Sequence, residues 1–367
     1  MKILHINSYY AEGKFYKHLY DEQVKNGASI DVFVPTHSAA NWDLGPYSKV
    51  SINHGKYDKY IFHLKHHKIY KDVIKQYAIE EFSLIHAHSL FSNGYIAMKL
   101  KREFGIPYIT AVRNADVNAF FKYMVHLRGL GVTILEEADG IVFLSEAYKD
   151  DVIKKYIPKA LQASITQKSY VIPNGIDAYW FENRTIDKAL PNNDVLKLLY
   201  VGAINKNKNI TTILKAIQIL QEKGFQIKFT IVGKVLDKAI YNEVVANHCV
   251  TYCSEKTREE LLMTYRMHDL FIMPSIYETF GLVYAEAMSQ ALPVIYSRGQ
   301  GFDRQFDEGE VGYSVNCFNA QEIADKIEAI IEQYPVISCN ASQKSQKFSW
   351  PRIAELYTTL YEGVATK

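Results

Sequence analysis

The sequence predicts an α/β protein with two Rossmann-like, doubly wound parallel-sheet domains that face a cleft. At 367 residues the chain is longer than a single hydrophobic core usually supports. Short apolar runs without polar alternation, typical of parallel strands covered on both faces, alternate with longer helical patterns. The alternation lapses after residue 176 and starts again at residue 195, which indicates two sheets joined by a connection.

Six apolar segments of the first half are expected to be strands. They are Ile3–Ile6, Ile30–Val34, Leu84–Ala87, Tyr108–Val112, Gly140–Leu144 and Tyr170–Ile172. Helical patterns lie between them, for example at Phe15–Asn26, Gly94–Glu103 and Ala147–Tyr156. Strands that alternate with helices predict βαβ units and therefore a parallel sheet.

The second half repeats this pattern. Its expected strands are Leu196–Val201, Ile227–Val232, Leu270–Met273 and Pro293–Ser297, and its expected helices are Ile210–Lys223, Arg258–Arg266, Gly281–Gln290 and Ala320–Gln333. Residues 177–194 are polar, include Pro191-Asn192-Asn193 and lack a clear period, so we expect the connection there. The expected divisions are 1–176, 177–194, 195–350 and a C-terminal helical segment, 351–367.

The composition argues against several classes of protein. A net charge of +2 disfavours a nucleic-acid-binding protein, which needs a concentrated basic surface. The first 175 residues contain 22 Lys and Arg against 17 Asp and Glu, so this half is the better candidate for an anionic partner or a membrane surface. The four cysteines form no Cys-x-x-Cys pair and are expected to be reduced, buried thiols.

We expect no targeting or membrane-spanning segment in this chain. Residues 1–6 have the pattern of a first strand rather than of a signal peptide. No run of eighteen apolar residues occurs. We therefore expect a cytoplasmic protein, and expect any membrane contact, at the inner face of the membrane, to be peripheral.

The most informative stretch is Pro274–Met288, which follows an apolar strand and opens a helix near Gly281. Glycine lets the backbone approach a ligand closely. The free N–H groups of Phe280, Gly281 and Leu282 would point at an anion or a hydroxyl, helped by the helix dipole.

Two acids flank this helix start. Glu278 precedes it and can accept hydrogen bonds from sugar hydroxyls, whereas Glu286 lies eight residues later and is able to reach a vicinal diol such as a ribose. The alternative is that Glu278 is an ordinary acid at a helix start and that Glu286 is solvated. The small residues around Glu286 make a solvated charge there unexpected.

Glu-x7-Glu in this setting resembles the signature of glycosyltransferase family 4, a retaining family with the two-Rossmann GT-B fold. The likeness covers nearly the whole chain. Three further parts are similar to family elements in the right order, namely Val171–Asp177, Tyr200–Gly202 followed by Lys208-Asn209, and Phe348–Trp350 before a last helix at Pro351–Tyr361. The resemblance implies that the first domain binds the acceptor, that the second binds the nucleotide sugar and that the last helix crosses back to the first domain.

The resemblance also implies roles for single residues. Glu278 would contact the donor sugar, Glu286 the ribose, and the amides of residues 280–282 the sugar and the phosphates. Lys208 lies in a polar loop between a strand and a helix, where a point charge can stabilise a departing diphosphate. Without the family resemblance, Lys208 would be interpreted as a solvated lysine of the loop.

Two more residues are expected at the donor site, and a third is expected to have a supporting role. Gly202 belongs to the segment that resembles the phosphate-binding loop, Gly233 to a loop expected to shape the pocket for the base or sugar, and Asn174 to the segment that closes the first domain. The family usually has Arg after the glycine of the phosphate-binding loop, but here Ala203 follows it. Either Lys206 or Arg298 would supply the missing cation, or the donor site would be weakened or specialised.

The first domain offers Arg113 and Asp116, which follow an expected strand. Many family members have His where Arg113 stands, and others have Arg. Arg113 would contact the donor phosphate or an anionic acceptor, and Asp116 would orient it or accept from acceptor hydroxyls. The alternative is a structural Arg–Asp pair.

Two further positions are given smaller roles. His86 and His88 are two residues apart and should face the same way at a strand end. Because no carboxylate is nearby in the sequence, we expect a packed, hydrogen-bonded His88 with a supporting role. Gly13, in the loop after the first strand, is expected near the donor phosphates. No Asp-x-Asp occurs, so we expect neither a metal nor another cofactor.

The expected function is that of a retaining, hexosyltransferase-type glycosyltransferase (EC 2.4). It would move a sugar from a nucleotide-diphosphate sugar, most plausibly a UDP-sugar, to a glycan or lipid-linked acceptor in cell-surface polysaccharide synthesis. The alternatives are a non-catalytic nucleotide-sugar-binding protein of the same fold or a nucleotide-sugar epimerase.

Residues 54–77 contain six lysines and four histidines interleaved with apolar residues. This composition favours either a membrane-surface face that recruits a lipid-linked acceptor or simply a strand followed by an amphipathic helix. We favour the second interpretation. The sequence gives no prediction of the oligomeric state.

Overall fold

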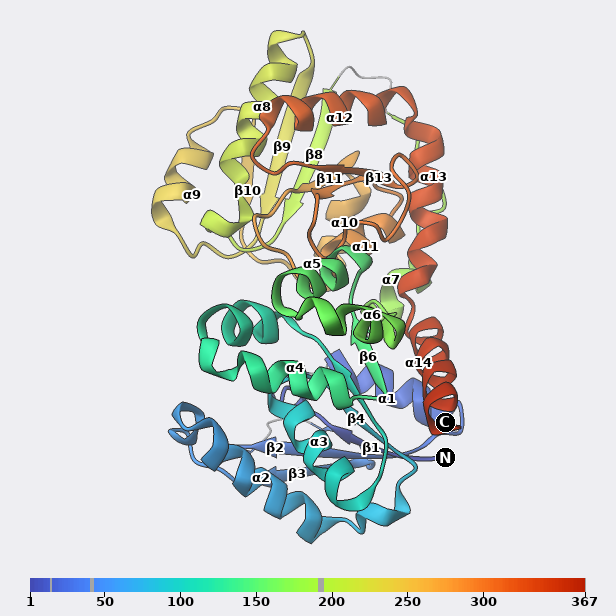
Figure 1. Cartoon of the computed structure of the whole chain (residues 1–367). Coiled ribbons are helices and arrows are strands. Elements are labelled where there is room, and N and C mark those ends of the chain that lie inside the picture. Colours follow the sequence, from blue (N-terminus) through green and yellow to red (C-terminus); the bar gives the residue numbers. More distant parts are fainter. Residues whose placement is uncertain (14, 40–42, 191–194, 367) are drawn as a thin grey trace. The chain divides into compact units, whose positions relative to one another are not determined.

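The computed structural model describes residues 1–13, 15–39, 43–190 and 195–366. The chain forms two compact units (Figure 1). Unit 1 comprises residues 1–144, 149–173 and 350–367, and unit 2 comprises residues 145–148 and 174–349. Each unit contains one parallel β-sheet, as the alternation of apolar runs and helical patterns predicts.

Unit 1 is built on seven parallel strands in the order β3-β2-β1-β4-β5-β6-β7. The strands are β1 (Lys2–Ile6), β2 (Ser29–Thr36), β3 (Ser48–Ile52), β4 (Leu84–Ala87), β5 (Tyr108–Ala111), β6 (Gly140–Phe143) and β7 (Ser169–Val171). The helices are α1 (Phe15–Lys25), α2 (Phe62–Gln76), α3 (Ser92–Phe104), α4 (Arg128–Glu137), α5 (Glu146–Tyr156), α6 (Lys159–Gln167) and α14 (Trp350–Ala365).

Helices cover both faces of this sheet. α3 packs on β4 and β5 and contacts α2 and α4, whereas α1 and α14 pack against each other and on β2 and β4 respectively. Strands β4, β5 and β6 are buried along their whole length, which explains their lack of polar alternation. Helix α14 comes from the far end of the chain and supplies buried aromatic and aliphatic side chains to the core of unit 1.

Unit 2 is built on six parallel strands in the order β10-β9-β8-β11-β12-β13. The strands are β8 (Val195–Val201), β9 (Gln226–Val232), β10 (Val250–Cys253), β11 (Leu270–Met273), β12 (Val294–Ser297) and β13 (Gly312–Val315). The helices are α7 (Ala178–Glu182), α8 (Ile210–Glu222), α9 (Lys238–Val245), α10 (Arg258–Arg266), α11 (Leu282–Ser289), α12 (Ala320–Glu332) and α13 (Tyr334–Lys344).

Several elements differ from the sequence-based expectation. The segment expected as a structureless connection contains α7 and belongs to unit 2, where the Thr185 N–H donates to Ser289 O at 3.1 Å. Its last four residues, 191–194, lie outside the described residues. Residues 54–61 form no strand, because β3 ends at Ile52 and a short 3₁₀ turn precedes α2. Strands β3, β10 and β13 were not predicted, since each is short and partly exposed or polar.

Two further expectations concern chemistry. All four cysteines are free thiols, and Cys249 is buried. Within the described ranges, no helix has the length and apolar character needed to cross a bilayer.

Candidate functional site

A pocket of about 420 Å³ lies in unit 2 beyond the carboxyl ends of β8 and β11. It is lined by Asn174, Val201, Gly202, Ala203, Lys208, Met273, Glu278, Thr279, Phe280, Gly281, Leu282 and Val283. β8 is the first strand of its sheet, and β9 and β11 lie on either side of it. Connections therefore leave in opposite directions at this point, which is where ligands bind in doubly wound sheets.

The loop after β8 is fixed by three asparagines. The Asn205 side chain accepts from the Lys208 N–H at 3.2 Å and caps the 3₁₀ turn Lys206–Lys208. The Asn207 side chain donates to Tyr277 O at 2.9 Å and accepts from the Tyr277 N–H at 3.0 Å. Asn209 has a left-handed backbone (φ 55°) and donates to Pro274 O at 3.2 Å. These bonds hold the loop that carries Lys208 against the loop that carries Glu278.

Lys208 and Glu278 form an ion pair inside the pocket. Lys208 Nζ lies 2.6 Å from Glu278 Oε2, and both side chains are less than a fifth exposed. The other carboxylate oxygen of Glu278 accepts from the Thr279 N–H at 3.1 Å. Its backbone N–H donates to the Gln300 side chain at 2.9 Å. The structure thus brings together two residues 70 positions apart that the sequence assigns to the same site.

The start of helix α11 forms the wall beside this pair. Gly281 has φ +76°, and a Cβ at this position would lie 2.5 Å from the Tyr284 ring, so the turn requires glycine. The Phe280 side chain is buried against Phe302 and Phe348, which leaves its backbone to face the pocket. Among the described hydrogen bonds none uses the N–H of Phe280, Gly281 or Leu282. These are the donors that a helix N-terminus offers to an anion.

Gly202 and Gly233 lie against each other behind the pocket. Gly233 has φ +146°, and its missing Cβ would lie only 2.1 Å from Gly202 O. Gly202 lines the pocket, but its N–H already donates to Val232 O at 2.9 Å. Gly233 is not among the lining residues, so its place in the structure is that of a spacer that lets the two loops approach. Asn174, for which only a supporting role was expected, also lines the pocket.

Glu286 lies one turn further along α11 and outside the pocket lining. Its Oε2 accepts from the Tyr265 hydroxyl at 3.1 Å. Burial raises the pKa of Glu286 to about 7, and the nearby Asp177 carboxylate adds to this increase. The hydrogen bond from Tyr265 acts in the opposite direction. The carboxyl group is therefore held in a confined environment rather than solvated.

Arg298 does not line the pocket. Its guanidinium lies 2.5 Å from Glu322 Oε1, and the side chain is 53% exposed. The structure therefore gives no support to Arg298 as the replacement for the cation missing at Ala203. The same loop instead supplies Gln300, which holds the backbone of Glu278.

Comparison with known proteins assigns the chain to a family. The model described as Glycosyl transferases group 1 matches residues 182–347, and the model described as Glycosyltransferase Family 4 matches residues 13–179. The chain belongs to glycosyltransferase family 4. As a family member it is a glycosyltransferase, and its two Rossmann-like units form the GT-B fold.

Individual relatives match all or part of this glycosyltransferase. An uncharacterised glycosyltransferase of Methanocaldococcus jannaschii is 25% identical over 385 residues, which cover 100% of this chain and 99% of the relative. The capsular polysaccharide biosynthesis glycosyltransferase CapM of Staphylococcus aureus is 26% identical over 239 residues, covering 60% and 62%. The Anabaena HepE structure in complex with UDP-glucose has the same fold, with a TM-score of 0.68 and 16% identity over the full length of both chains.

In unit 1 of the glycosyltransferase, Arg113 and Asp116 follow β5 but have different environments. Arg113 is partly exposed, and its guanidinium is hydrogen-bonded to the hydroxyl of Tyr357 from α14. Asp116 is fully buried and accepts from the N–H groups of Leu90, Phe91 and Arg113 at 3.0, 3.1 and 2.8 Å. Burial raises the pKa of Asp116 to about 6, although these three hydrogen bonds act to lower it. Both carboxylate oxygens are thus occupied, which favours the orienting role expected of Asp116 over contact with acceptor hydroxyls.

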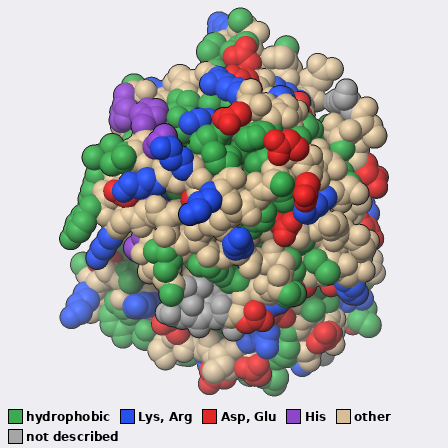
Figure 2. Space-filling model, turned by 90° about the horizontal axis from the view of Figure 1, so that it is seen from below, with side chains coloured by type: hydrophobic (Ala, Val, Ile, Leu, Met, Phe, Trp, Pro, Cys, Tyr) green, Lys and Arg blue, Asp and Glu red, His purple; other side chains and the backbone are tan. Residues whose placement is uncertain are grey.

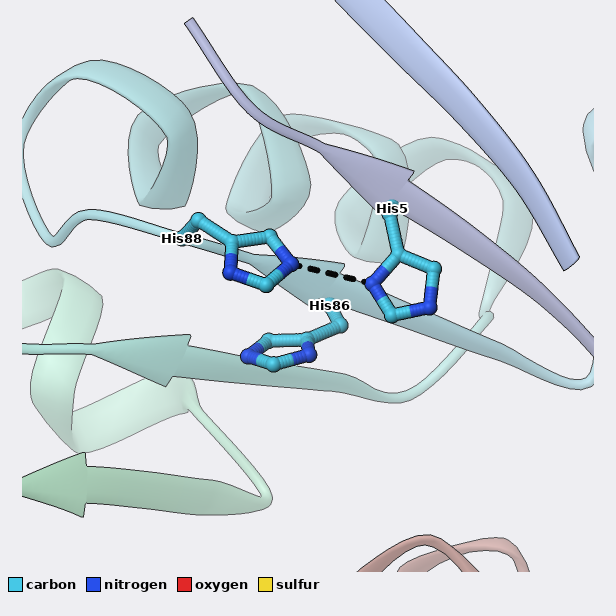
Figure 3. A group of neighbouring side chains, drawn as sticks. All are labelled: His5, His86 and His88. Carbon is cyan, nitrogen blue, oxygen red and sulfur yellow. Dashed lines mark hydrogen bonds between the residues drawn. The ribbon is translucent and has the colours of Figure 1, made fainter. Parts of the chain in front are cut away.

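His88 belongs to a buried group of three histidines that includes His5, which the sequence analysis did not identify (Figure 3). His5 Nδ1 lies 3.0 Å from His88 Nε2, and His86 Nδ1 lies 2.7 Å from the Tyr361 hydroxyl of α14. The His86 and His88 rings are 4.0 Å apart, as their spacing predicts. Burial lowers the pKa of His5 to about 3 and that of the other two well below the usual value. The three neutral rings connect β1 and β4 to α14.

Gly13, the last residue with an expected role, follows a 3₁₀ turn in unit 1 with extended backbone (φ −174°). A Cβ there would meet no atom within 4 Å, so its conformation does not require glycine.

The sequence analysis missed the residues that position the site rather than line it. These are Asn205, Asn207, Asn209, Tyr265, Gln300, His5 and Tyr357. Asparagine favours helix caps and left-handed turns. The three asparagines of Asn205-Lys206-Asn207-Lys208-Asn209 were therefore a usable sequence signal for a fixed loop. The others become visible only once the chain has folded.

Proposed function

We propose that this glycosyltransferase transfers a hexose, with retention of anomeric configuration, from a UDP-sugar to a glycan or lipid-linked acceptor in cell-surface polysaccharide synthesis. The observation that carries the donor part is the pocket that combines the Lys208 ammonium, the Glu278 carboxylate and the α11 N-terminus. The capsular polysaccharide relative supports the pathway, and the HepE complex with UDP-glucose supports the donor class.

The donor diphosphate would lie against Lys208 and the amides of residues 280–282. In the pocket Glu278 neutralises Lys208 at 2.6 Å. A diphosphate would offer more negative charge to the lysine and the helix N-terminus, which releases Glu278 to accept from hydroxyls of the donor sugar. Glu286 would bind the ribose hydroxyls. The cations and amide groups together would supply the charge neutralisation that makes a metal or another cofactor unnecessary.

The chemical step would proceed on one face of the donor sugar. The bond between the anomeric carbon and the diphosphate oxygen breaks, and Lys208 and the amides stabilise the departing diphosphate. The acceptor hydroxyl attacks from the same side, and its proton passes to the leaving phosphate oxygen. This route needs no carboxylate nucleophile, and Glu278 would orient the sugar.

Unit 1 would provide the acceptor-binding surface, with Arg113 contacting a phosphate of the donor or of an anionic acceptor. Its contact with Tyr357 fixes the guanidinium. Peripheral contact with the inner face of the membrane would bring a lipid-linked acceptor within reach. The family match favours this transferase over the two alternatives, a non-catalytic sugar-nucleotide-binding protein and an epimerase.

A single-turnover assay with UDP-, GDP- and ADP-sugars tests the proposal. We expect UDP release from one UDP-hexose, stimulated by a polyprenyl-diphosphate-sugar acceptor, and a product that keeps the anomeric configuration of the donor in ¹H NMR spectra. Replacing Glu278 by Gln should lower kcat about 10²-fold or more, whereas Glu243→Gln, an exposed acid on α9, should leave it unchanged.

Three results would overturn parts of this proposal. An inverted product would refute the retaining mechanism. Preference for GDP- or ADP-sugars would refute the donor assignment. Full activity of Glu278→Gln would remove Glu278 from the site.

A further inference from the structure

Glu278 lies on a segment without regular secondary structure, residues 274–281, which connects β11 to α11. A side chain on such a segment keeps a fixed position only where other elements hold the backbone. The outer surface is less specific, since basic, acidic and hydrophobic side chains are interspersed on the face shown in Figure 2. The asparagines after β8 hold one side of the segment, and the loop after β12 holds the other.

The loop after β12 binds both backbone polar groups of Glu278. The Glu278 N–H donates to Gln300 Oε1 at 2.9 Å, and the Gly301 N–H donates to Glu278 O at 2.9 Å. Earlier in both segments, Ser297 Oγ donates to Ser275 O at 2.5 Å. Residues 297–301 therefore lie beside residues 275–278 and hold them by hydrogen bonds at both ends.

The two segments approach too closely for a side chain at position 301. A Cβ on Gly301 would lie 1.6 Å from Thr279 O and 2.7 Å from the Phe280 backbone nitrogen. Glycine is therefore the residue that permits this contact between two backbones. Position 301 provides the close approach, and position 300 provides the side chain that binds Glu278.

The loop that carries Gln300 is itself held in place. The buried Asp303 side chain accepts from the Gly299 N–H at 2.7 Å, and the Asp303 N–H donates to Gln300 O at 2.9 Å. The buried Phe302 ring packs against the Tyr284 ring of α11, with centroids 4.7 Å apart. Gln300 is thus presented to Glu278 by a turn that Asp303 closes and that Phe302 anchors on α11.

Gln300 is connected to the site through the backbone of Glu278. It is not among the residues that line the pocket. The Glu278 carboxylate lies 2.6 Å from Lys208 and accepts from the Thr279 N–H at 3.1 Å. A shift of the backbone at position 278 would move this carboxylate within the pocket. Removing the Gln300 oxygen would favour such a shift, because the Glu278 N–H would lose its acceptor.

We propose that Gln300 is a positioning residue for sugar transfer. By accepting from the Glu278 N–H, it keeps the carboxylate where the donor sugar binds. This role of Gln300 rests on the proposed role of Glu278 and involves no contact with substrate. Diphosphate binding depends instead on Lys208 and the amides of residues 280–282. Loss of the Gln300 oxygen should therefore lower kcat far more than donor affinity.

Steady-state kinetics of the full-length enzyme test this role, with the UDP-hexose that the wild type uses and the polyprenyl-diphosphate-sugar acceptor. Gln300→Met has a similar length but no acceptor oxygen. We expect its kcat to fall at least about tenfold, with KM for the UDP-hexose and Kd for UDP changed less than about twofold. Gln300→Glu keeps an oxygen at this position and should restore kcat to within about threefold of the wild type. Gln321→Met, the same change at an exposed position of α12, is the matched control and should leave kcat unchanged.

A double variant separates an action through Glu278 from a general effect on the fold. Glu278→Gln/Gln300→Met should have the same kcat as Glu278→Gln, because Gln300 then has no carboxylate to position. The increase in melting temperature caused by UDP reports whether each variant keeps its donor pocket.

A wild-type kcat in Gln300→Met, or equal losses of kcat and UDP affinity, would overturn the positioning role. So would a Gln300→Glu variant no faster than Gln300→Met, or losses that multiply in the double variant. An impaired Glu278→Gln would leave the proposed function intact in each of these cases. Full activity of Glu278→Gln would refute the roles of both residues.

Discussion

Glu286 is a carboxyl group whose ionisation opposes folding. Its folded pKa of about 7 lies above the ordinary value of 4.5 because the group is buried in α11. A raised carboxyl pKa contributes stability that is complete below pH 4.5 and is lost as pH rises through 7. The difference corresponds to about 3 kcal/mol between the two protonation states.

Replacing Glu286 by Gln should remove this pH dependence. We expect the variant to match the wild type near pH 5 and to be more stable at pH 8 by about 1–3 kcal/mol, since no buried charge has to form. Urea denaturation at both pH values measures the difference. Equal effects at pH 5 and pH 8 would show that the carboxyl group titrates normally in the folded protein.

Single residues also show what the sequence was able to predict. Glu278, Lys208 and the α11 amides were predicted because their residue types and their places next to strand ends carry the chemistry. The role of Asp116 stayed open because an acid in a loop has the same sequence pattern whether it faces a substrate or backbone N–H groups. Only the fold shows that three amides occupy it.

The turn from Glu278 into α11 depends on its backbone shape. Gly281 has φ +76°, and a Cβ there would lie 2.5 Å from the Tyr284 ring, whose hydroxyl donates to Met273 O at the end of β11. Residues 280–282, which include this turn, line the pocket, and no described hydrogen bond uses their N–H groups. Local geometry of one turn thereby determines where the pocket offers hydrogen-bond donors.

Gly281→Ala should therefore lower both stability and UDP binding. The left-handed backbone and the clash with Tyr284 together should cost about 1–3 kcal/mol. Gly363→Ala in α14 is the control, because nothing lies within 4 Å of its Cβ position and alanine favours helix by about 1 kcal/mol. Urea titrations of both variants and the wild type give the unfolding free energies for this comparison. An unchanged stability of Gly281→Ala would contradict the strained turn.

Elements were predicted well where burial makes their pattern uniform. β4, β5, β6 and β11 are buried along their whole length, and the apolar runs locate them. β3 has mostly exposed or half-buried residues and resembles a loop in the sequence. Helix α7 spans only five residues, too few to show a helical period.

At the scale of the whole molecule, the last helix completes the first sheet unit. One face of α14, from Trp350 to Val364, belongs to the buried core of unit 1, together with strands near the N-terminus. The Tyr361 hydroxyl accepts from Gln23 at 3.1 Å and contacts His86 Nδ1 at 2.7 Å. Unit 1 thus depends on segments from both ends of the chain. In the sequence, only the family resemblance implied that the last helix returns to the first domain.

Tyr361→Phe should destabilise the protein by about 1–3 kcal/mol, because the polar atoms of Gln23 and His86 lose a buried partner. Tyr123→Phe, at a position 71% exposed, should change stability little. Thermal unfolding of the two variants and the wild type gives the comparison. A Tyr361→Phe protein as stable as the wild type would mean that α14 is held by apolar packing alone.

The central claim is that one pocket of unit 2 holds a nucleoside diphosphate between Lys208 and the start of α11. Isothermal titration calorimetry with UDP, GDP and ADP tests it most directly. We predict one site selective for UDP, an affinity at least about tenfold lower in Lys208→Met, and no change in Lys215→Met, an exposed lysine on α8. Absence of nucleotide binding, or equal affinity of Lys208→Met and the wild type, would contradict the account.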